Sequence, residues 1–206
     1  ELKRFCSFLV VAVLFVSCNK TTDFHIIQGE AQGSTYSIKY ISNEEKVTKN
    51  QIDSLLTAFD LSLSTYRPDS KISKINSGDS TVVVDDFFTE TFQLSNQIYK
   101  ETMGLFDPTI GVLVNAYGFG PNKKQEDLSQ KQIDSLLQFV GFDKITLNPN
   151  KTISKKHQET FIDFNAIAQG YSVDVVVNYL KLKGIENAIV EIGGELFALG
   201  KNTIEN

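Results

Sequence analysis

The amino-acid sequence predicts an α+β protein with largely antiparallel or mixed sheets and packed helices. Hydrophobic residues make up 41% of the 206-residue chain and charged residues 22%, which is enough apolar material for a sizeable core. The strands that the pattern predicts both follow one another across short turns and alternate with helices. This arrangement favours α+β over a doubly wound parallel fold.

The first half of the chain predicts a strand and two helices, with a short strand between the helices. In residues 35–41, apolar Tyr36, Ile38 and Tyr40 alternate with polar residues, as in a half-buried strand. The sequence Thr-Lys-Asn-Gln at 48–51 is a capping box, and apolar residues then recur at helical spacing up to position 63. A strand is predicted at 81–84, and a second helix at 88–102, ending at Gly104.

The second half predicts two more helices and several strands. A capping box begins at Ser129, and Gly141 is expected to end the helix that follows. Strands are predicted at 144–147, 152–154, 160–164, 188–192 and 196–199. The Asn-Pro-Asn-Lys sequence at 148–151 predicts a hairpin turn. The last helix is expected from Ala166 to about Lys183, with Gly184 ending it.

Composition excludes several classes of function. Both cysteines, Cys6 and Cys18, lie in the first 18 residues, so the body has no disulfide, thiolate metal site or cysteine nucleophile. Two histidines make a multi-histidine zinc site improbable, and a net charge of -5 gives no global basic field for nucleic acid. Chemistry must therefore come from carboxylates, hydroxyls, backbone groups and a hard cation.

The N-terminus has the layout of an export signal. Lys3 and Arg4 precede an apolar run over 5–16 that is too short to span a membrane. Phe-Val-Ser-Cys at 15–18 resembles a bacterial lipoprotein box, which predicts a signal peptide over 1–17 and lipidation of Cys18. A plain export signal, or a buried N-terminal strand with an incidental cysteine, are the alternatives. Residues 18–30 are expected to form a tether, and the domain to begin at 31.

Four segments are richer in glycine, polar and aromatic residues than connecting loops require: 32–36, 63–76, 104–121 and 163–171, the last followed by 191–195. At the fourth, a strand ends at Asp163 and a helix opens near Ala166, so backbone N–H groups can face an anion. The Asp163 carboxylate and nearby carbonyls are the hard oxygen ligands that suit Mg²⁺, and Gly170 permits close approach of a ligand or backbone. The alternative is that Asp163 only caps the helix.

The other segments also leave two interpretations open. Phe106 beside Asp107, in a glycine-rich loop with aromatics, can clasp a planar ligand or can simply be a rigid loop over the core. Arg67 can contact a phosphate or be solvated in a turn. Gly193 and Gly194 suit a bulge or tight turn between strands better than a phosphate cradle, and neither G-x-G-x-x-G nor Walker A occurs.

Taken in this order, the segments resemble the ApbE family of FAD:protein FMN transferases. The resemblance rests on residues 33–38, 64–73, 106–121, 163–171 and 190–195. It implies a T-fold-like architecture and Mg²⁺-dependent transfer of FMN from FAD to a Thr hydroxyl of a target flavoprotein, with release of AMP. An FAD pyrophosphatase that yields FMN and AMP, a non-catalytic flavin-binding lipoprotein, or a structural domain without ligand are the alternatives. Family members of this kind are anchored in the cell envelope and face the periplasm.

The resemblance also implies individual roles. The positions that match FAD-contacting positions of the family are Gln32, where the family commonly has Met, Tyr66, Leu105, Phe106, Asp107 and Asp163. Asp163 is also the predicted catalytic residue, and Ala166 matches an Mg²⁺ ligand through its backbone carbonyl. The family completes this metal site with a later Asp and Thr. No such pair follows Glu195, so the sequence is expected to be a fragment without the C-terminal part of the domain.

Overall fold

The computed structural model describes residues 23–121 and 127–202. Its main sheet is antiparallel and has the strand order β1-β2-β5-β6, formed by β1 (Asp23–Ala31), β2 (Ser34–Ser42), β5 (Ala188–Ile192) and β6 (Glu195–Leu199). A separate hairpin pairs β3 (Ile145–Leu147) with β4 (Ile153–Lys155). The predicted α+β class and the antiparallel sheets are confirmed.

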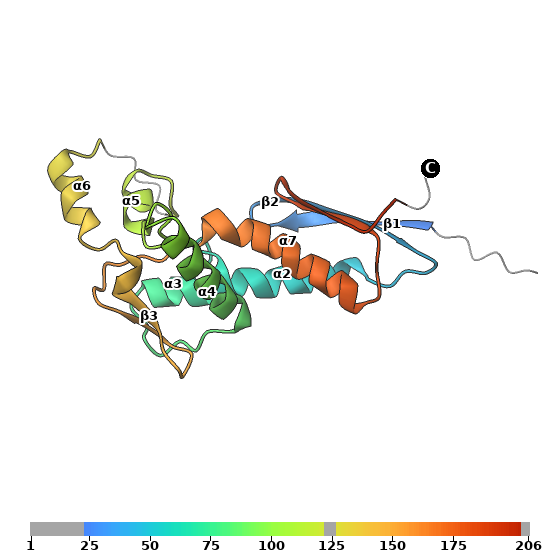
Figure 1. The fold of residues 1–206 in the computed structure, drawn as a ribbon, viewed down its shortest axis with the longest axis horizontal. Helices are drawn as coiled ribbons and strands as arrows, with labels where there is room; N and C mark the ends of the chain where they lie inside the picture. The colour runs from blue at the N-terminus through green and yellow to red at the C-terminus, as the bar shows by residue number, and fades with distance from the viewer. Residues whose placement is uncertain (1–22, 122–126, 203–206) are drawn as a thin grey trace, which may run out of the picture.

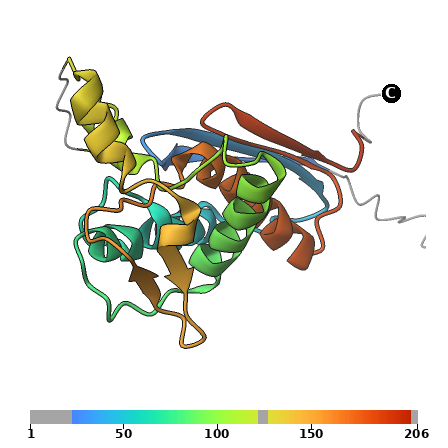
Figure 2. The ribbon, with the colours of Figure 1, turned by 60° about the vertical axis from the view of Figure 1, so that its left-hand side comes forward.

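The helices divide into a pair beneath the sheet and a group beyond its end (Figures 1 and 2). The pair is α2 (Lys49–Leu63) and α7 (Asn165–Leu182). The group comprises α3 (Lys71–Asn76), α4 (Asp86–Glu101), α5 (Gly111–Ala116), α6 (Gln130–Leu137) and the short 3-10 helix η1 (Phe142–Lys144). Within the two described ranges, every helix is too short or too polar to cross a membrane.

Two hydrophobic cores lie side by side along the pair of helices. The first is formed by the inner face of the sheet, including Tyr36 and Ile38, with the N-terminal half of α2 and the C-terminal half of α7. The second joins the C-terminal half of α2 and Ala168 of α7 to α3, α4 and the β3–β4 hairpin. Because α2 and α7 contribute to both cores in opposite order, they run antiparallel and connect the two halves of the molecule.

Local sequence rules account for most helix starts. Both predicted capping boxes are present: the Thr48 N–H donates to Gln51 Oε1 at 3.0 Å, and the Ser129 N–H donates to Gln132 Oε1 at 2.9 Å. The predicted turn at 148–151 closes the β3–β4 hairpin, with the Asn148 N–H donating to the Thr152 carbonyl at 2.8 Å. Helix α7 begins and ends within a residue of the prediction.

The predicted tether over 18–30 is wrong from Asp23 onward, because residues 23–31 form β1. This strand pairs with β2 along its whole length, from Asp23 opposite Ser42 to Ala31 opposite Ser34. Its sequence does not alternate between apolar and polar residues, since Ile26 and Ile27 are adjacent, although Ile26 is exposed and only Ile27 is buried. The strand is therefore defined by its partner, and the domain begins before residue 31.

Two of the predicted strands are absent from the described residues because no partner strand lies beside them, and the end of α6 also differs from the prediction. Residues 81–84 and 160–164 are not strands: the Val84 N–H donates only to the Lys151 carbonyl, and Phe161 forms one isolated bridge to Ile110. Val84, Ile162 and Phe164 are buried while Val83 is exposed, and no strand of the described residues pairs with either segment. Helix α6 ends at Leu137, and Gly141, with φ +145°, precedes η1 instead of ending α6. The short helices α3 and α5 were not predicted.

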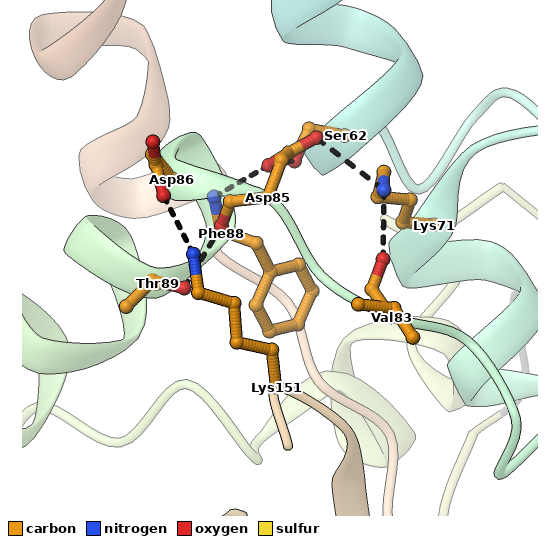
Figure 3. Close-up of polar contacts among 8 residues, drawn as sticks. All are labelled: Ser62, Lys71, Val83, Asp85, Asp86, Phe88, Thr89 and Lys151. Carbon is orange, nitrogen blue, oxygen red and sulfur yellow. Dashed lines mark hydrogen bonds and ion pairs between the residues drawn. The ribbon is translucent and has the colours of Figure 1, made fainter. Parts of the chain in front are cut away.

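A polar junction fixes the start of α4 against α2 and α3 (Figure 3). The Asp85 carboxylate accepts from the Phe88 N–H at 3.0 Å, as an N-cap, and from Ser62 Oγ at 2.6 Å. Lys71 lies 3.7 Å from the same carboxylate and donates to the Val83 carbonyl at 2.7 Å. One aspartate therefore connects three helices beneath the second core.

We expect Asp85→Ala to lower the free energy of unfolding by about 2 kcal/mol, because it removes a helix cap and leaves the buried Ser62 hydroxyl without its acceptor. Chemical denaturation measures this loss. The control is Asp86→Ala, which removes only an exposed ion pair to Lys151 and is expected to cost about 0.5 kcal/mol. Equal losses in the two variants would contradict a capping role for Asp85.

Candidate functional site

A cavity of about 630 Å³ lies where the C-terminal end of α2 meets the N-terminal end of α7. This volume suits a small-molecule ligand. Three of the four segments singled out in the sequence supply its walls, together with the end of α2: Gln32, Gly33, Phe59, Asp60, Leu63, Ser64, Tyr66, Arg67, Asn165, Ala168 and Gln169. The fold therefore brings together residues that are more than 130 positions apart in the chain.

The β1–β2 turn forms one wall. Gln32 and Gly33 have φ values of +55° and +72°, the conformation of a tight two-residue hairpin turn. Ser172 Oγ of α7 lies 3.3 Å from Gln32 Oε1, which ties the turn to the helix. The buried Gln32 Nε2 has no hydrogen-bond partner within the described part of the chain. Gln32 lines the cavity, and its predicted contact with FAD stays a prediction.

The loop after α2 forms the opposite wall. The Ser70 hydroxyl closes this loop by donating to the Ser64 carbonyl at 2.7 Å. Tyr66 is 58% exposed, and its hydroxyl donates to the Phe119 carbonyl at 3.2 Å. Arg67 forms a bidentate pair with Asp69, at 3.1 and 2.8 Å. Arg67 is the only basic side chain among the described lining residues, and its predicted contact with a phosphate stays a prediction.

Asp60, in the last turn of α2, is a cavity residue that the sequence reasoning missed. Burial raises the pKa of its carboxyl, while the charge of Arg67 and the N–H of Gln32 act in the opposite direction. The available signal was an acid next to Phe59 in the apolar stripe of α2. A charged residue at the edge of such a stripe is common on amphipathic helices, so the pattern alone does not mark it as functional.

Asp163 stands immediately before α7 but does not line this cavity. Its Oδ1 accepts from the Asn165 N–H at 2.8 Å, and its own N–H donates to the Pro108 carbonyl at 2.7 Å. Burial raises the pKa of the Asp163 carboxyl, and the hydrogen bonds from Asn165 lower it in part. The N-cap of α7 is Phe164, so Asp163 is not the cap residue; its side chain accepts the Asn165 N–H one position before the cap. Its role toward a ligand stays a prediction.

The 104–121 segment lies beside the cavity without forming its described walls. Leu105 is 91% exposed, and the Phe106 N–H is held by Thr102 Oγ1 at 3.1 Å. The Asp107 carboxylate accepts from the Thr109 N–H and hydroxyl at 2.8 and 2.6 Å, so it shapes the turn. Leu105, Phe106 and Asp107 are thus not brought into the cavity, although the contact of Tyr66 with Phe119 connects their loop to it.

The β5–β6 turn buttresses the N-terminal end of α7. Gly193 and Gly194 have φ values of +57° and +96°, which makes the pair a tight turn between strands, the alternative that the sequence favoured. Gln169 Nε2 donates to the Gly193 carbonyl at 2.8 Å. A Cβ on Gly193 would lie 1.7 Å from that nitrogen, so only glycine permits the contact. Gly170, by contrast, has no atom within 4 Å of such a position, and the close protein backbone approach expected there is absent among the described residues.

The oxygen donors expected for Mg²⁺ lie at the start of α7. Asp163 is half-buried and Ala166 is exposed in the first turn. Across the described ranges, no group of three or more His, Cys, Asp or Glu side chains is arranged to hold a metal ion. A carboxylate and a backbone carbonyl are donor types that Mg²⁺ takes, usually one or two from the protein with phosphate oxygens and water completing its shell. The signal peptide and Cys18 lie outside the described residues.

Comparison with known proteins places the chain in a family whose model covers most of the residues described above. The model of the ApbE family matches residues 32–205. The chain belongs to the ApbE family. Among proteins named FAD:protein FMN transferase, that of Haemophilus influenzae is 32% identical over 94% of this chain, and that of Vibrio cholerae is 35% identical over 94%.

Solved ApbE structures resemble this ApbE-family chain. The flavin transferase ApbE from Vibrio cholerae covers 88% of the chain with a TM-score of 0.81 and 34% identity. The apo form of the Pseudomonas stutzeri flavinyl transferase ApbE also covers 88%, with a TM-score of 0.80 and 30% identity. The chain spans about 60% of the length of these relatives, 60% for both named transferases and 61% and 62% for the two structures.

We expect Gly193→Ala to lower the free energy of unfolding by about 1–3 kcal/mol, because the new Cβ displaces Gln169 from the β5–β6 turn. Gly170→Ala is the matched control: it adds a Cβ in open space on α7 and is expected to raise stability by about 0.5–1 kcal/mol. Thermal unfolding compares the two. Destabilisation by Gly170→Ala of the same size as by Gly193→Ala would contradict this assignment.

Proposed function

We propose that the complete protein transfers FMN from FAD to a Thr hydroxyl of a target flavoprotein and releases AMP. The observation that carries the proposal is the cavity between the ends of α2 and α7, in a chain whose relatives are named FAD:protein FMN transferases. Its walls combine apolar side chains with amides and a single Arg, which suits a ligand that has a planar ring system and an anionic phosphate group.

In the proposed reaction, the Thr oxygen forms a bond to the phosphorus of the FMN half of FAD. The bond from this phosphorus to the bridging oxygen breaks, and that oxygen leaves with AMP. The hydroxyl proton passes to a basic group or to water. In phosphoryl transfer, positioning and electrostatic stabilisation supply most of the rate acceleration. Arg67 is the described lining residue suited to hold phosphate oxygens, and Tyr66 and Gln32 are suited to hold the rings.

We also propose that Mg²⁺ assists, with the Asp163 carboxylate and the Ala166 carbonyl among its ligands. When bound, the ion neutralises charge on the pyrophosphate. Asp163 is suited to this role because its buried carboxylate is held at the end of α7, and a neighbouring cation would favour the ionised form that burial disfavours.

The test is incubation of the full-length protein with FAD, Mg²⁺ and a peptide that bears the acceptor Thr. FMN attached to the peptide, detected by mass, supports transfer. Free FMN and AMP would indicate a pyrophosphatase, and intact FAD that raises the melting temperature would indicate a binding module. Absence of any flavin-dependent thermal shift would indicate a structural domain and overturn the proposal.

We expect Asp163→Asn in the full-length protein to lower FAD turnover strongly while raising stability at pH 7. Burial raises the folded-state pKa of Asp163, so this residue favours folding at low pH and loses that contribution as the pH rises through that pKa. The neutral Asn keeps an acceptor for the Asn165 N–H. Its stability advantage should shrink as the pH falls toward about 4. Unchanged turnover of FAD in this variant would show that Asp163 has only a structural role at the start of α7.

We propose further that Cys18 is lipidated and anchors the mature protein to the membrane, facing the periplasm. The support is the charged, apolar and small-residue layout of residues 1–18. Cys18→Ser is expected to move the protein from the membrane fraction to the soluble fraction of exporting cells. Retention of the variant in membranes would contradict lipidation at this residue.

A further inference from the structure

We propose that Asp60 is a positioning residue of this site: its carboxylate holds the Gln32–Gly33 turn and the Arg67 loop in the arrangement that binds FAD. The inference rests on the proposed function, because it assigns a role within the same cavity. No motif of the sequence points to Asp60, and its position in the fold carries the argument.

Asp60 stands between two cavities. It lines the cavity of about 630 Å³, and it also lines a neighbouring cavity of about 380 Å³ formed by the end of β1 and one face of α2. No other described residue is shared by the two linings. Asp60 therefore lies where the two cavities adjoin, next to the β1–β2 turn.

The two groups that face the carboxylate come from opposite walls of the cavity. The Gln32 backbone N–H points to it from the β1–β2 turn, and the charge of Arg67 acts on it from the loop after α2. The Asp60 carbonyl also accepts from the Ser64 N–H at 3.0 Å, where that loop begins. Asp60 therefore interacts with the β1–β2 turn and with the loop after α2 from its own position in the last turn of α2.

The turn needs such support because Gln32 has a φ of +55°, a conformation that is unfavourable for a side chain with a Cβ. A carboxylate that accepts the N–H of this residue offsets the strain, and charge-assisted hydrogen bonds are stronger than neutral ones. Arg67 pairs with Asp69, and the charge of Asp60 acts on the same guanidinium, so two carboxylates favour its position in this loop. Both effects hold the Gln32–Gly33 turn and the Arg67 side chain in position in the free protein. The entropy that these groups lose when a ligand binds is therefore smaller.

The experiment compares Asp60→Ala, Asp60→Asn and the control Asp53→Ala in the full-length protein. Asp53 lies seven residues earlier on α2, lines only the smaller cavity and pairs with Lys49 at 2.6 Å. We expect Asp60→Ala to raise the Kd for FAD, measured by flavin fluorescence, about tenfold, consistent with loss of a charge-assisted contact. Asp60→Asn keeps an oxygen acceptor for the turn and should recover most of the affinity, and Asp53→Ala should change the Kd less than twofold.

A second readout does not depend on FAD. Hydrogen exchange at the Gln32 amide should be faster in Asp60→Ala than in the wild-type protein and near normal in Asp60→Asn. An unchanged Gln32 amide, an unchanged Kd in Asp60→Ala, or tighter FAD binding in either Asp60 variant would overturn the positioning role. Failure of the wild-type protein to bind FAD would instead overturn the proposed function, and Gln32 exchange would still decide whether Asp60 holds the turn.

Discussion

The structure depends on the antiparallel pairing of α2 and α7, which are shared by two hydrophobic cores. Each helix buries one half against the four-stranded sheet and the other half against the smaller helices and the β3–β4 hairpin (Figure 1). Neither core closes without both helices. The point where the C-terminal end of α2 meets the N-terminal end of α7 is therefore fixed from both sides, and the cavity lies at that point.

Two tight turns, Gln32–Gly33 and Gly193–Gly194, complete the site because each hydrogen-bonds to the N-terminal half of α7. The Gln32–Gly33 turn reaches α7 through Ser172, and the Gly193–Gly194 turn reaches it through Gln169. Both turns occupy backbone conformations that most residues avoid. Such conformations persist only where surrounding contacts hold them, and here those contacts come from the same helix that lines the cavity.

The chemistry of the site is that of oxygen and amide groups. Asp60 and Asp163 are half-buried carboxylates with pKa values raised by burial, one at the end of α2 and the other before α7. Burial of a carboxylate costs free energy unless a hydrogen bond, a positive charge or a cation offsets it. Each has a backbone N–H partner, from Gln32 and Asn165 respectively, and the charge of Arg67 acts on Asp60. Carboxylates of this kind are the oxygen donors that a hard cation takes.

Residue pattern by itself determined the features that depend on neighbours in sequence. Helices α2 and α7, the capping boxes, the 148–151 turn and strands β2, β5 and β6 follow from periodicity and turn chemistry. Resemblance to the ApbE family singled out Gln32 and Tyr66, which both line the cavity. Only the tertiary structure decided that residues 23–31 form a strand and that residues 81–84 do not. It also decided that Asp60 lines two cavities, while Leu105, Phe106 and Asp107 are not among the residues that line the larger one. Strand pairing and cavity walls are set by partners distant along the chain, so no local pattern encodes them.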